Sequence, residues 1–510
     1  MKIPDIRKPE KFAALPLLLI LCLALSLRII MFSGFIGSDD YAYAKIANQV
    51  VNGTFEIGAV EGKAQHYLRF GVFLPVAAAF KLFGINEWSL ALFPMICSIL
   101  SIILIYIACK TIFNSHTGLI AAFILAIVPE HVQLASICYP SMASSLWCNI
   151  PVVLTFVALN SNGKKQISAG ILTGLALGIS WYTKATVVFI LPFVIGCAIW
   201  DTFRKKNINL LVAILIPFSL VLASEFFLYH IKVGDALYRF HVTEQNYAEG
   251  NVCLFVKNSP YGWQEGHYFE ALFRRLFLDG PRIIFTRRFY GNTTGIALIG
   301  LFYAILKRQK CFVFACSWFL WNVFIFNFGT TSLDIYRPLV LYKDQMLPVG
   351  FSATVVCAGL LGLLIRPAKK AIGEEAKEHR FWGLLLLLGI ILSCAAELKE
   401  IAATRPDIKS NLQYLKVIPE GSRIYADTLD SRFYTFYTSF AGLYTIIDYE
   451  KTRDVYPENG SYVVIPIKFT SISNDHFRHK IPAYCHKIPG GWESIGENNN
   501  MRLYRVPIQQ

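Results

Sequence analysis

The sequence contains few charged residues for a chain of its length, since only 16% of its 510 residues are Asp, Glu, Lys or Arg. A soluble protein carries about a quarter, so this shortage excludes an ordinary water-exposed surface. Hydrophobic residues make up 55% of the chain and give it a mean hydropathy of +0.47. Runs of about 20 apolar residues recur, each long enough to cross a hydrocarbon core of roughly 30 Å. The sequence therefore predicts a polytopic α-helical membrane protein.

Metal-ligand motifs are also missing. No CxxC or paired Cys/His spacing occurs among the 12 cysteines. Most of these cysteines lie inside apolar runs, where a thiol behaves as a small hydrophobe. We therefore expect no structural metal site. Cys253 and Cys485 both fall in segments expected outside the membrane, so a disulfide between them is allowed but not established.

The first apolar run, residues 12–32, lacks a small-residue cleavage site and is too long for the apolar region of a signal peptide. We interpret it as an uncleaved first span. About eleven spans are expected, near residues 12–32, 89–109, 117–137, 139–158, 166–182, 185–200, 208–228, 291–306, 311–328, 346–365 and 381–397. With the N-terminus in the cytoplasm, every cytoplasmic stretch contains Lys or Arg, as the positive-inside rule requires. We expect a multi-pass protein of the cell or inner membrane.

This topology leaves four regions outside the membrane, at about 33–88, 229–290, 329–345 and from 398 onward. Residues 71–83 are apolar but too few to span, so we expect an interfacial or re-entrant helix there. After residue 398 the runs GSRIYAD, YTIIDYE, SYVVIPI and MRLYRVP are β-prone, with a helical stretch between the first two. The predicted domains are a transmembrane domain at 1–397 and a small extracytoplasmic α/β domain at 398–510.

Two adjacent carboxylates, Asp39 and Asp40, lie between the first apolar run and an amphipathic segment that Gly53 closes. They suit a helix start, with Asp39 as the N-cap and Asp40 favouring the helix dipole. They also suit catalysis, because a carboxylate at the membrane boundary can take the proton of an acceptor hydroxyl. Two adjacent acids could ligate a divalent cation, but no third ligand is evident, so we favour a metal-free site. Spacing alone leaves these alternatives open.

Basic residues in the outer segments are the opposite of what the positive-inside rule favours, so we look for a functional explanation. Cations at a membrane boundary suit an anionic lipid phosphate, with snorkelling to lipid headgroups as the alternative. The candidates for phosphate binding, in descending order, are Arg337, Lys343, Lys184 and Arg69. Further candidate polar groups of the site are Arg28, His66, Glu130, His131 and Glu225. We expect Arg28 to snorkel, and we expect structural roles for Glu130, His131 and Glu225. The basic residues form no continuous stripe, so nucleic acid is not an expected partner.

The order of these features resembles the membrane-embedded GT-C glycosyltransferases that use polyprenyl-phosphate sugars. Glycosyltransferase family 39 and its relatives, the protein O-mannosyltransferases and aminoarabinose transferases, are the most similar. LALSLRIIMFSGFIGSDDYAYAKIANQVVNG is similar to the family's span, connector and Asp-Glu-x-x-Tyr-x-x-x-Ala helix, with Asp39, Asp40, Tyr43 and Ala47 at the four positions. GILTGLALGISWYTKATVVFILP resembles a Gly-rich span that ends at a Lys, here Lys184. Two further resemblances lie in LRFGVFLPVAAAFKLFGINEWSLALFP and SEFFLYHIKVGDALYRF.

The sequence also departs from the family pattern at two places. Ser141 stands where many relatives carry an Asp, and Lys343 stands where relatives often show Arg-Tyr. The first departure weakens the case for a second acid in the site. The second keeps the positive charge but loses the bidentate fork of Arg.

The resemblance implies an inverting transfer of a sugar from a polyprenyl-phosphate carrier to an acceptor hydroxyl on the extracytoplasmic face. It implies Asp39 as the base and Asp40 as a residue that orients the acceptor or binds a cation, although either acid could take the proton. The sugar, and whether the acceptor is a protein, lipid or glycan, stay open. A transporter or flippase of a lipid-linked glycan is the alternative from another class. Transporters usually show two related halves, and no internal repeat is evident here.

Overall fold

The computed structural model describes residues 13–58, 64–185, 187–249, 293–307, 310–329, 346–365, 374–403, 408–452, 455–467, 482–498 and 501–508. The chain forms two compact units, which are described separately. The helical unit comprises Met1–Ser33, Glu56–Val72 and Leu92–Ala403. The mixed unit comprises Gly34–Phe55, Phe73–Ala91 and Thr404–Gln510. The predicted division at residue 397 stays a prediction, because the mixed unit also includes two N-terminal segments.

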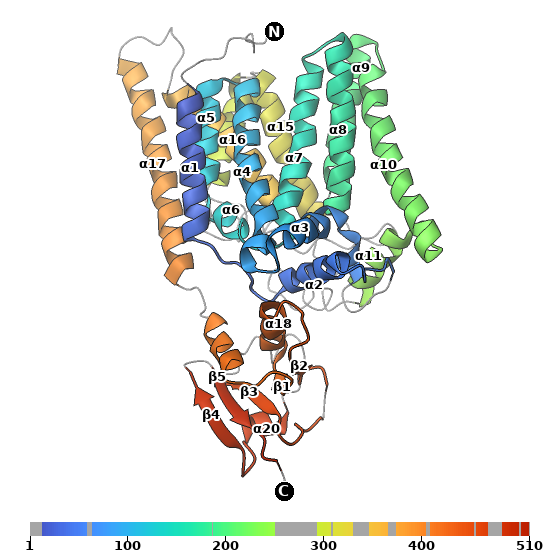
Figure 1. The fold of residues 1–510 in the computed structure, drawn as a ribbon. Helices are drawn as coiled ribbons and strands as arrows, with labels where there is room; N and C mark the ends of the chain where they lie inside the picture. Colours follow the sequence, from blue (N-terminus) through green and yellow to red (C-terminus); the bar gives the residue numbers. More distant parts are fainter. Residues whose placement is uncertain are drawn as a thin grey trace, which may run out of the picture. The chain divides into compact units, whose positions relative to one another are not determined.

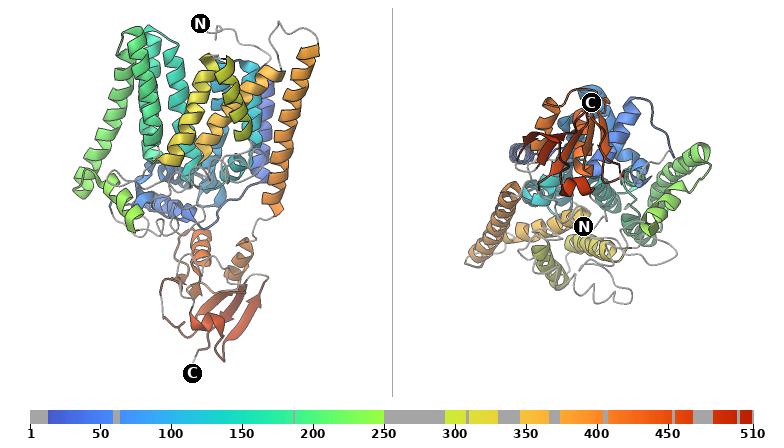
Figure 2. Two further views of the ribbon diagram at one scale, coloured as in Figure 1. Left: turned by 180° about the vertical axis from the view of Figure 1, so that it is seen from behind. Right: turned by 90° about the horizontal axis from the view of Figure 1, so that it is seen from below.

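The helical unit is a bundle of long helices (Figure 1). Its elements are α1 (Ala14–Ile30), η1 (Ala64–Leu68), most of α4 (Glu87–Ile112), α5 (Ser115–Ile127), α6 (Pro129–Leu134), α7 (Pro140–Leu159), α8 (Gly163–Thr183), α9 (Val187–Lys205), α10 (Asn209–Val233), α11 (Tyr238–Glu249), α14 (Thr294–Lys307), α15 (Lys310–Phe328), α16 (Leu347–Ile365) and α17 (Glu374–Ala403). Within this unit, α17 and α10 lie on opposite sides of the bundle in each view (Figure 2).

Ten of the eleven predicted spans each coincide with one helix, and the polytopic helical fold is confirmed. Among the described residues, six helices are long and apolar enough to cross a membrane: Glu87–Ile112, Pro140–Leu159, Val187–Lys205, Asn209–Val233, Leu347–Ile365 and Lys377–Ala403. The prediction of one continuous span at 117–137 is wrong. Helix α5 ends at Ile127 and α6 starts at Pro129, because a proline disfavours the α conformation of the residue before it. Val128 accordingly adopts ψ 122°.

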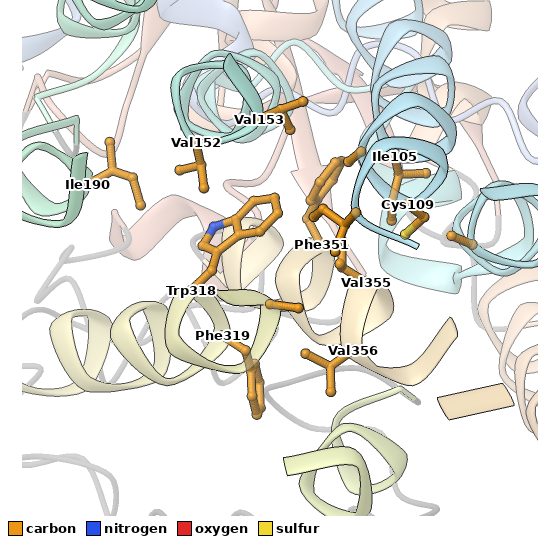
Figure 3. Packing of buried hydrophobic residues seen from close by; sticks show 14 of the residues in the cluster. Ile105, Cys109, Val152, Val153, Ile190, Trp318, Phe319, Phe351, Val355 and Val356 are labelled. Carbon is orange, nitrogen blue, oxygen red and sulfur yellow. The ribbon is translucent and has the colours of Figure 1, made fainter. Parts of the chain in front are cut away.

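Close packing of small and aromatic residues holds the helical unit together. The Gly-rich span has a packing reason, because a Cβ on Gly174 of α8 would lie 2.3 Å from the Ile214 backbone oxygen of α10. Such small residues let two apolar helices approach closely. Elsewhere, Trp318 of α15 is fully buried near Phe351 of α16, with 5.7 Å between ring centroids (Figure 3). Helix α16 buries 14 of its 19 residues.

The mixed unit contains a five-stranded sheet in the order β2-β1-β3-β5-β4. The strands are β1 (Arg423–Ala426), β2 (Thr445–Asp448), β3 (Tyr462–Pro466), β4 (Glu493–Glu497) and β5 (Met501–Arg505). Strand β1 pairs in parallel with β2 and β3, while β3, β5 and β4 pair antiparallel. Its helical elements are α2 (Asp39–Val51), most of α3 (Phe70–Phe83), the first residues of α4, η5 (Ile408–Lys416), α18 (Thr428–Tyr437) and α20 (Ala483–His486).

The predicted α/β character of the C-terminal region is confirmed. All four β-prone runs form strands, and the helical stretch between the first two forms α18. The predicted short helix at 71–83 is α3, whose 14 residues are too few to span. Strand β4 was not predicted, because its sequence ESIGE carries two acids and a glycine and lies at the edge of the sheet.

Candidate active site

The two adjacent acids follow a short turn and open helix α2; residues 34–40 are named the acid loop. The helix begins at Asp39 with Ser38 as its N-cap, so the prediction of Asp39 as the N-cap is wrong by one position. Gly34 and Gly37 adopt φ of 68° and 74°, a region that favours glycine because a Cβ there clashes with the backbone. A Cβ on Gly37 would also lie 2.6 Å from Leu429 Cδ1.

Asp40 closes the acid loop onto itself. Its side chain is fully buried, and its two oxygens accept the backbone N–H groups of Ile36 and Ser38, each at 2.6 Å. These hydrogen bonds favour the ionised carboxyl, but burial outweighs them and raises the pKa of Asp40 to about 6. Asp39 is only half-buried, in the first turn of the same helix. Tyr43, one turn later, is fully buried.

Arg28 does not snorkel, which corrects the prediction for this residue. It is fully buried in α1, and its Nε donates to Ser98 Oγ at 2.7 Å. Its Nη1 donates to the carbonyls of Ala24 and Ala126 at 2.9 and 3.0 Å. Its Nη2 lies 3.1 Å from Nδ1 of His131, which is also buried. Arg28 and His131 therefore join α1, α4, α5 and α6.

Glu225 forms a buried ion pair in the helical unit. Arg239 Nε lies 3.0 and 3.1 Å from the two Glu225 oxygens, and Arg239 Nη2 and Trp181 Nε1 also donate to this carboxylate. Arg239 Nη2 donates to the Leu68 carbonyl at 2.7 Å. Two observations agree with the expected structural role of Glu225: its side chain is fully buried, and its carboxylate accepts four hydrogen bonds. Glu130 is half-buried in α6.

Two of the four phosphate candidates lie in the described part of the helical unit, Arg69 after η1 and Lys184 at the end of α8, both half-buried. Their neighbours touch. A Cβ on Gly71 would lie 3.0 Å from the Thr183 backbone nitrogen, and the rings of Phe70 and Tyr182 are 6.0 Å apart. The structure thus brings the two segments together.

The remaining candidate site residues are either buried or outside the described part of the chain. His66 is buried in η1. Arg337 and Lys343 lie outside the described residues, and so does Cys253, whose pairing with Cys485 the sequence left open.

The donor set of the acid loop does not favour a metal. Both oxygens of Asp40 already accept backbone N–H groups. Within the described ranges, no group of three or more His, Cys, Asp or Glu side chains is arranged to hold a metal ion.

Sequence reasoning missed the residues that contact the acid loop but lie far from it along the chain. The main ones are Glu87, Arg432 and Tyr437. Glu87 and Tyr437 are 350 positions apart, and no local pattern connects them. Glu87 does lie in one of the family-like segments, at the start of a predicted span, and an acid at a helix start was the one signal available.

Comparison with known proteins agrees with this arrangement. Residues 71–224 match the family described as "Dolichyl-phosphate-mannose-protein mannosyltransferase". An undecaprenyl phosphate-alpha-4-amino-4-deoxy-L-arabinose arabinosyl transferase of Pseudomonas fluorescens is 27% identical over 419 residues, which are 74% of this chain and 70% of that protein. The crystal structure of apo ArnT from Cupriavidus metallidurans aligns with a TM-score of 0.57 at 14% identity, over 96% of this chain and 97% of that one. The chain has the GT-C fold.

A second solved structure with a similar fold is an oligosaccharyltransferase. The Archaeoglobus fulgidus oligosaccharyltransferase aligns with a TM-score of 0.53 at 14% identity, over 86% of this chain and 64% of that one. The predicted resemblance to GT-C membrane glycosyltransferases is therefore confirmed, and so is the prediction of a membrane enzyme of this class. The relatives named here are all glycosyltransferases, which gives the transporter alternative no support.

Proposed function

We propose that the protein is an inverting glycosyltransferase that moves a sugar from a polyprenyl-phosphate carrier to an acceptor hydroxyl at the extracytoplasmic face of the membrane. The single observation that carries this proposal is the GT-C fold combined with the acid loop, in which one acid is buried and the other is partly exposed. The names of the relatives support the donor class. One ArnT structure is bound to undecaprenyl phosphate, and the arabinosyl transferase carries undecaprenyl phosphate in its name.

The two acids have separate roles in this proposal. Asp39 is the general base, because its partial exposure leaves it accessible to an acceptor hydroxyl. Asp40 is a positioning residue, because its oxygens hold the turn that precedes Asp39. Asp40 is also ill suited to be the base, because it is fully buried and both of its oxygens already accept backbone N–H groups.

The reaction is a single displacement at the anomeric carbon. As the acceptor oxygen attacks from the face opposite the phosphate, its proton passes to the Asp39 carboxylate. The bond between the anomeric carbon and the phosphate oxygen breaks, and its electron pair leaves with the polyprenyl phosphate. Cationic side chains stabilise the negative charge that develops on the departing phosphate. Lys184 and Arg69 are the described candidates for this task, and Arg337 and Lys343 remain candidates from the sequence.

The test is a turnover assay with purified protein in lipid nanodiscs. A panel of undecaprenyl-phosphate pentoses and hexoses is supplied with candidate acceptors, and both released carrier phosphate and glycosylated product are measured. Asp39→Asn should abolish transfer, and Asp40→Asn should reduce it. Asp235→Asn is a matched control, because Asp235 lies near the surface beside His241. Full transfer by a folded Asp39→Asn variant would sink the base assignment. Movement of an intact lipid-linked sugar across vesicles, without any cleavage, would favour the transporter.

Sidedness is part of the same proposal. The N-terminus is placed in the cytoplasm, with the acid loop and residues 398–510 outside, because the basic residues of the predicted short loops then follow the positive-inside rule. Membrane-impermeant thiol labelling of cells tests this. A cysteine introduced at exposed Lys416 should react in intact cells, and one introduced at Lys164 should react only after permeabilisation.

A further inference from the structure

Several contacts between the acid loop and the rest of the mixed unit meet at one carboxylate, that of Glu87. Glu87, the first residue of α4, accepts the backbone N–H of Phe35 on Oε1 at 3.3 Å. The hydroxyl of Tyr437, at the end of α18, donates to the same oxygen. Lys409 Nζ, from η5, lies 2.7 Å from the Glu87 carboxylate. One side chain therefore contacts the acid loop and two elements of the C-terminal region, η5 and α18.

Helix α18 also packs directly on the acid loop. The Phe35 ring is 1% exposed and stacks on Phe436, with centroids 4.1 Å apart and an interplanar angle of 7°. Phe433 meets the same ring edge-on at 5.0 Å. At the other end of the turn, Arg432 Nη1 donates to the Gly37 carbonyl at 2.7 Å. Phe35 and Gly37 are thus fixed by α18, and the N–H groups of Ile36 and Ser38 are fixed by Asp40.

We propose that Glu87 is a positioning residue, which makes the geometry of Asp39 depend on the C-terminal α/β region. This inference rests on the proposed function for its catalytic consequence, but the structural coupling stands without it. Asp39 directly follows the turn whose backbone groups are held from both sides. A carboxylate that must meet an acceptor hydroxyl needs a fixed position, and an error of about 1 Å can cost on the order of 100-fold in rate.

Two simpler explanations for an acid at position 87 account for fewer of its contacts. An acid in the first turn of a helix favours the helix dipole, but this leaves the Tyr437 and Phe35 contacts unexplained. A partly exposed ion pair with Lys409 is worth at most about 1 kcal/mol, and Lys409 is 39% exposed. Neither explanation predicts that loss of the Glu87 side chain alters the acid loop.

Kinetics of four variants test the coupling. Glu87→Ala removes every contact of the carboxylate, Glu87→Gln keeps an oxygen that can accept from Phe35 and Tyr437, and Tyr437→Phe removes one donor. Glu420→Ala is the matched control, since Glu420 is an exposed acid of the same unit. We expect kcat to fall about 10- to 100-fold in Glu87→Ala, with partial recovery in Glu87→Gln. The donor KM should stay within about twofold, because Lys184 and Arg69 belong to the helical unit.

Hydrogen exchange gives a readout that needs no activity. The amides of residues 34–40 should exchange at least about tenfold faster in Glu87→Ala and Tyr437→Phe than in wild type or Glu420→Ala. If Glu87→Ala does not fold, Glu87→Gln and Tyr437→Phe carry the test. Unchanged exchange in the folded variants would overturn the coupling, as would wild-type kcat in Glu87→Ala. If wild-type protein transfers no sugar from any donor, the proposed function fails, while exchange still decides the coupling.

Discussion

Arg28 and His131 are 103 positions apart, yet Nη2 of Arg28 lies 3.1 Å from Nδ1 of His131 in the interior of the helical unit. A guanidinium carries only donors, so Nδ1 accepts and the ring is the neutral tautomer with its proton on Nε2. Ser98 Oγ lies 2.7 Å from Arg28 Nε and 3.1 Å from the same ring nitrogen. A buried cation is thus surrounded by neutral oxygen and nitrogen groups from several helices.

We predict that Arg28→Lys destabilises the protein by about 2 kcal/mol or more, because Lys keeps a buried charge but lacks the planar fork that reaches four acceptors. A side chain that snorkelled would tolerate this exchange. Denaturant unfolding in mixed micelles measures the loss, with Arg380→Lys as the control because Arg380 is exposed on α17. Equal stability of the two variants would contradict the buried assignment.

The sequence shows that residue 28 is an arginine, but it does not show whether the side chain points to the membrane surface or into the protein. Arg28 lies near the end of an apolar run, where snorkelling is the cheapest outcome for a long cation. The actual partners come from α4, α5 and α6, and only the packing of those helices reveals them. Hydropathy located the long apolar helices because burial in lipid depends on composition alone. The break at Pro129 was local and could have been predicted from the proline itself.

A second prediction concerns the ion pair of Glu225 and Arg239. Arg239→Met should destabilise the protein by about 3 to 5 kcal/mol, because it leaves a buried carboxylate without its counter-charge. The double variant Glu225→Gln with Arg239→Met should be less destabilised than the sum of the two single variants. Denaturant unfolding of all three measures the coupling.

The neighbouring pair Asp235 and His241 is the matched control for this cycle. It lies on the same connection, but its side chains are 34% and 62% exposed, so Asp235→Asn should cost no more than about 1 kcal/mol. If Asp235→Asn lowered the free energy of unfolding as much as Arg239→Met does, this connection would be sensitive to any substitution. The predicted effect would then not be specific to the buried ion pair.

A third prediction follows from the pKa of Asp40, which burial raises from its ordinary 3.8 to about 6. The folded state therefore holds this proton more tightly than the unfolded state. The resulting stabilisation is fully present below pH 4 and is lost as the pH rises through 6, by up to about 3 kcal/mol. Thermal unfolding between pH 4.5 and 7 should show this decline in wild type and a flatter profile in Asp40→Asn.

Comparison with Asp40→Asn isolates this group from other acids of the mixed unit. Burial also raises the pKa of Asp427 to about 6, and neighbouring carboxylates add to the effect. That contribution is present in both proteins and cancels in the difference. Identical pH profiles for wild type and Asp40→Asn would show that Asp40 keeps an ordinary pKa.

The acid loop shows what sequence reasoning can and cannot supply for a site. The two acids and the helix that they open could be located from a dipeptide, a following amphipathic pattern and the family-like order. Their difference in exposure could not, because it depends on the turn in which Asp40 accepts two backbone N–H groups. The partners from α18 could not be predicted either, since Arg432 lies 395 positions from Gly37.

The last prediction concerns Gly37, where the turn meets α18. Gly37 and Gly53 have similar positive φ, 74° and 69°, but an added Cβ meets Leu429 at 2.6 Å and Phe433 at 2.9 Å only at Gly37. Gly53→Ala should thus report backbone strain alone, about 1 kcal/mol. Gly37→Ala should cost a further 1 to 3 kcal/mol, roughly, from overpacking.

The double variant Gly37→Ala with Leu429→Ala separates crowding from strain, because it removes the side chain nearest to the new methyl group. We expect its unfolding free energy to recover part of the loss, relative to Leu429→Ala alone. If Gly37→Ala and Gly53→Ala were equally stable, α18 would not be packed against the turn. Transfer activity should fall in Gly37→Ala and stay near wild type in Gly53→Ala, because only the first change displaces the backbone directly before Asp39.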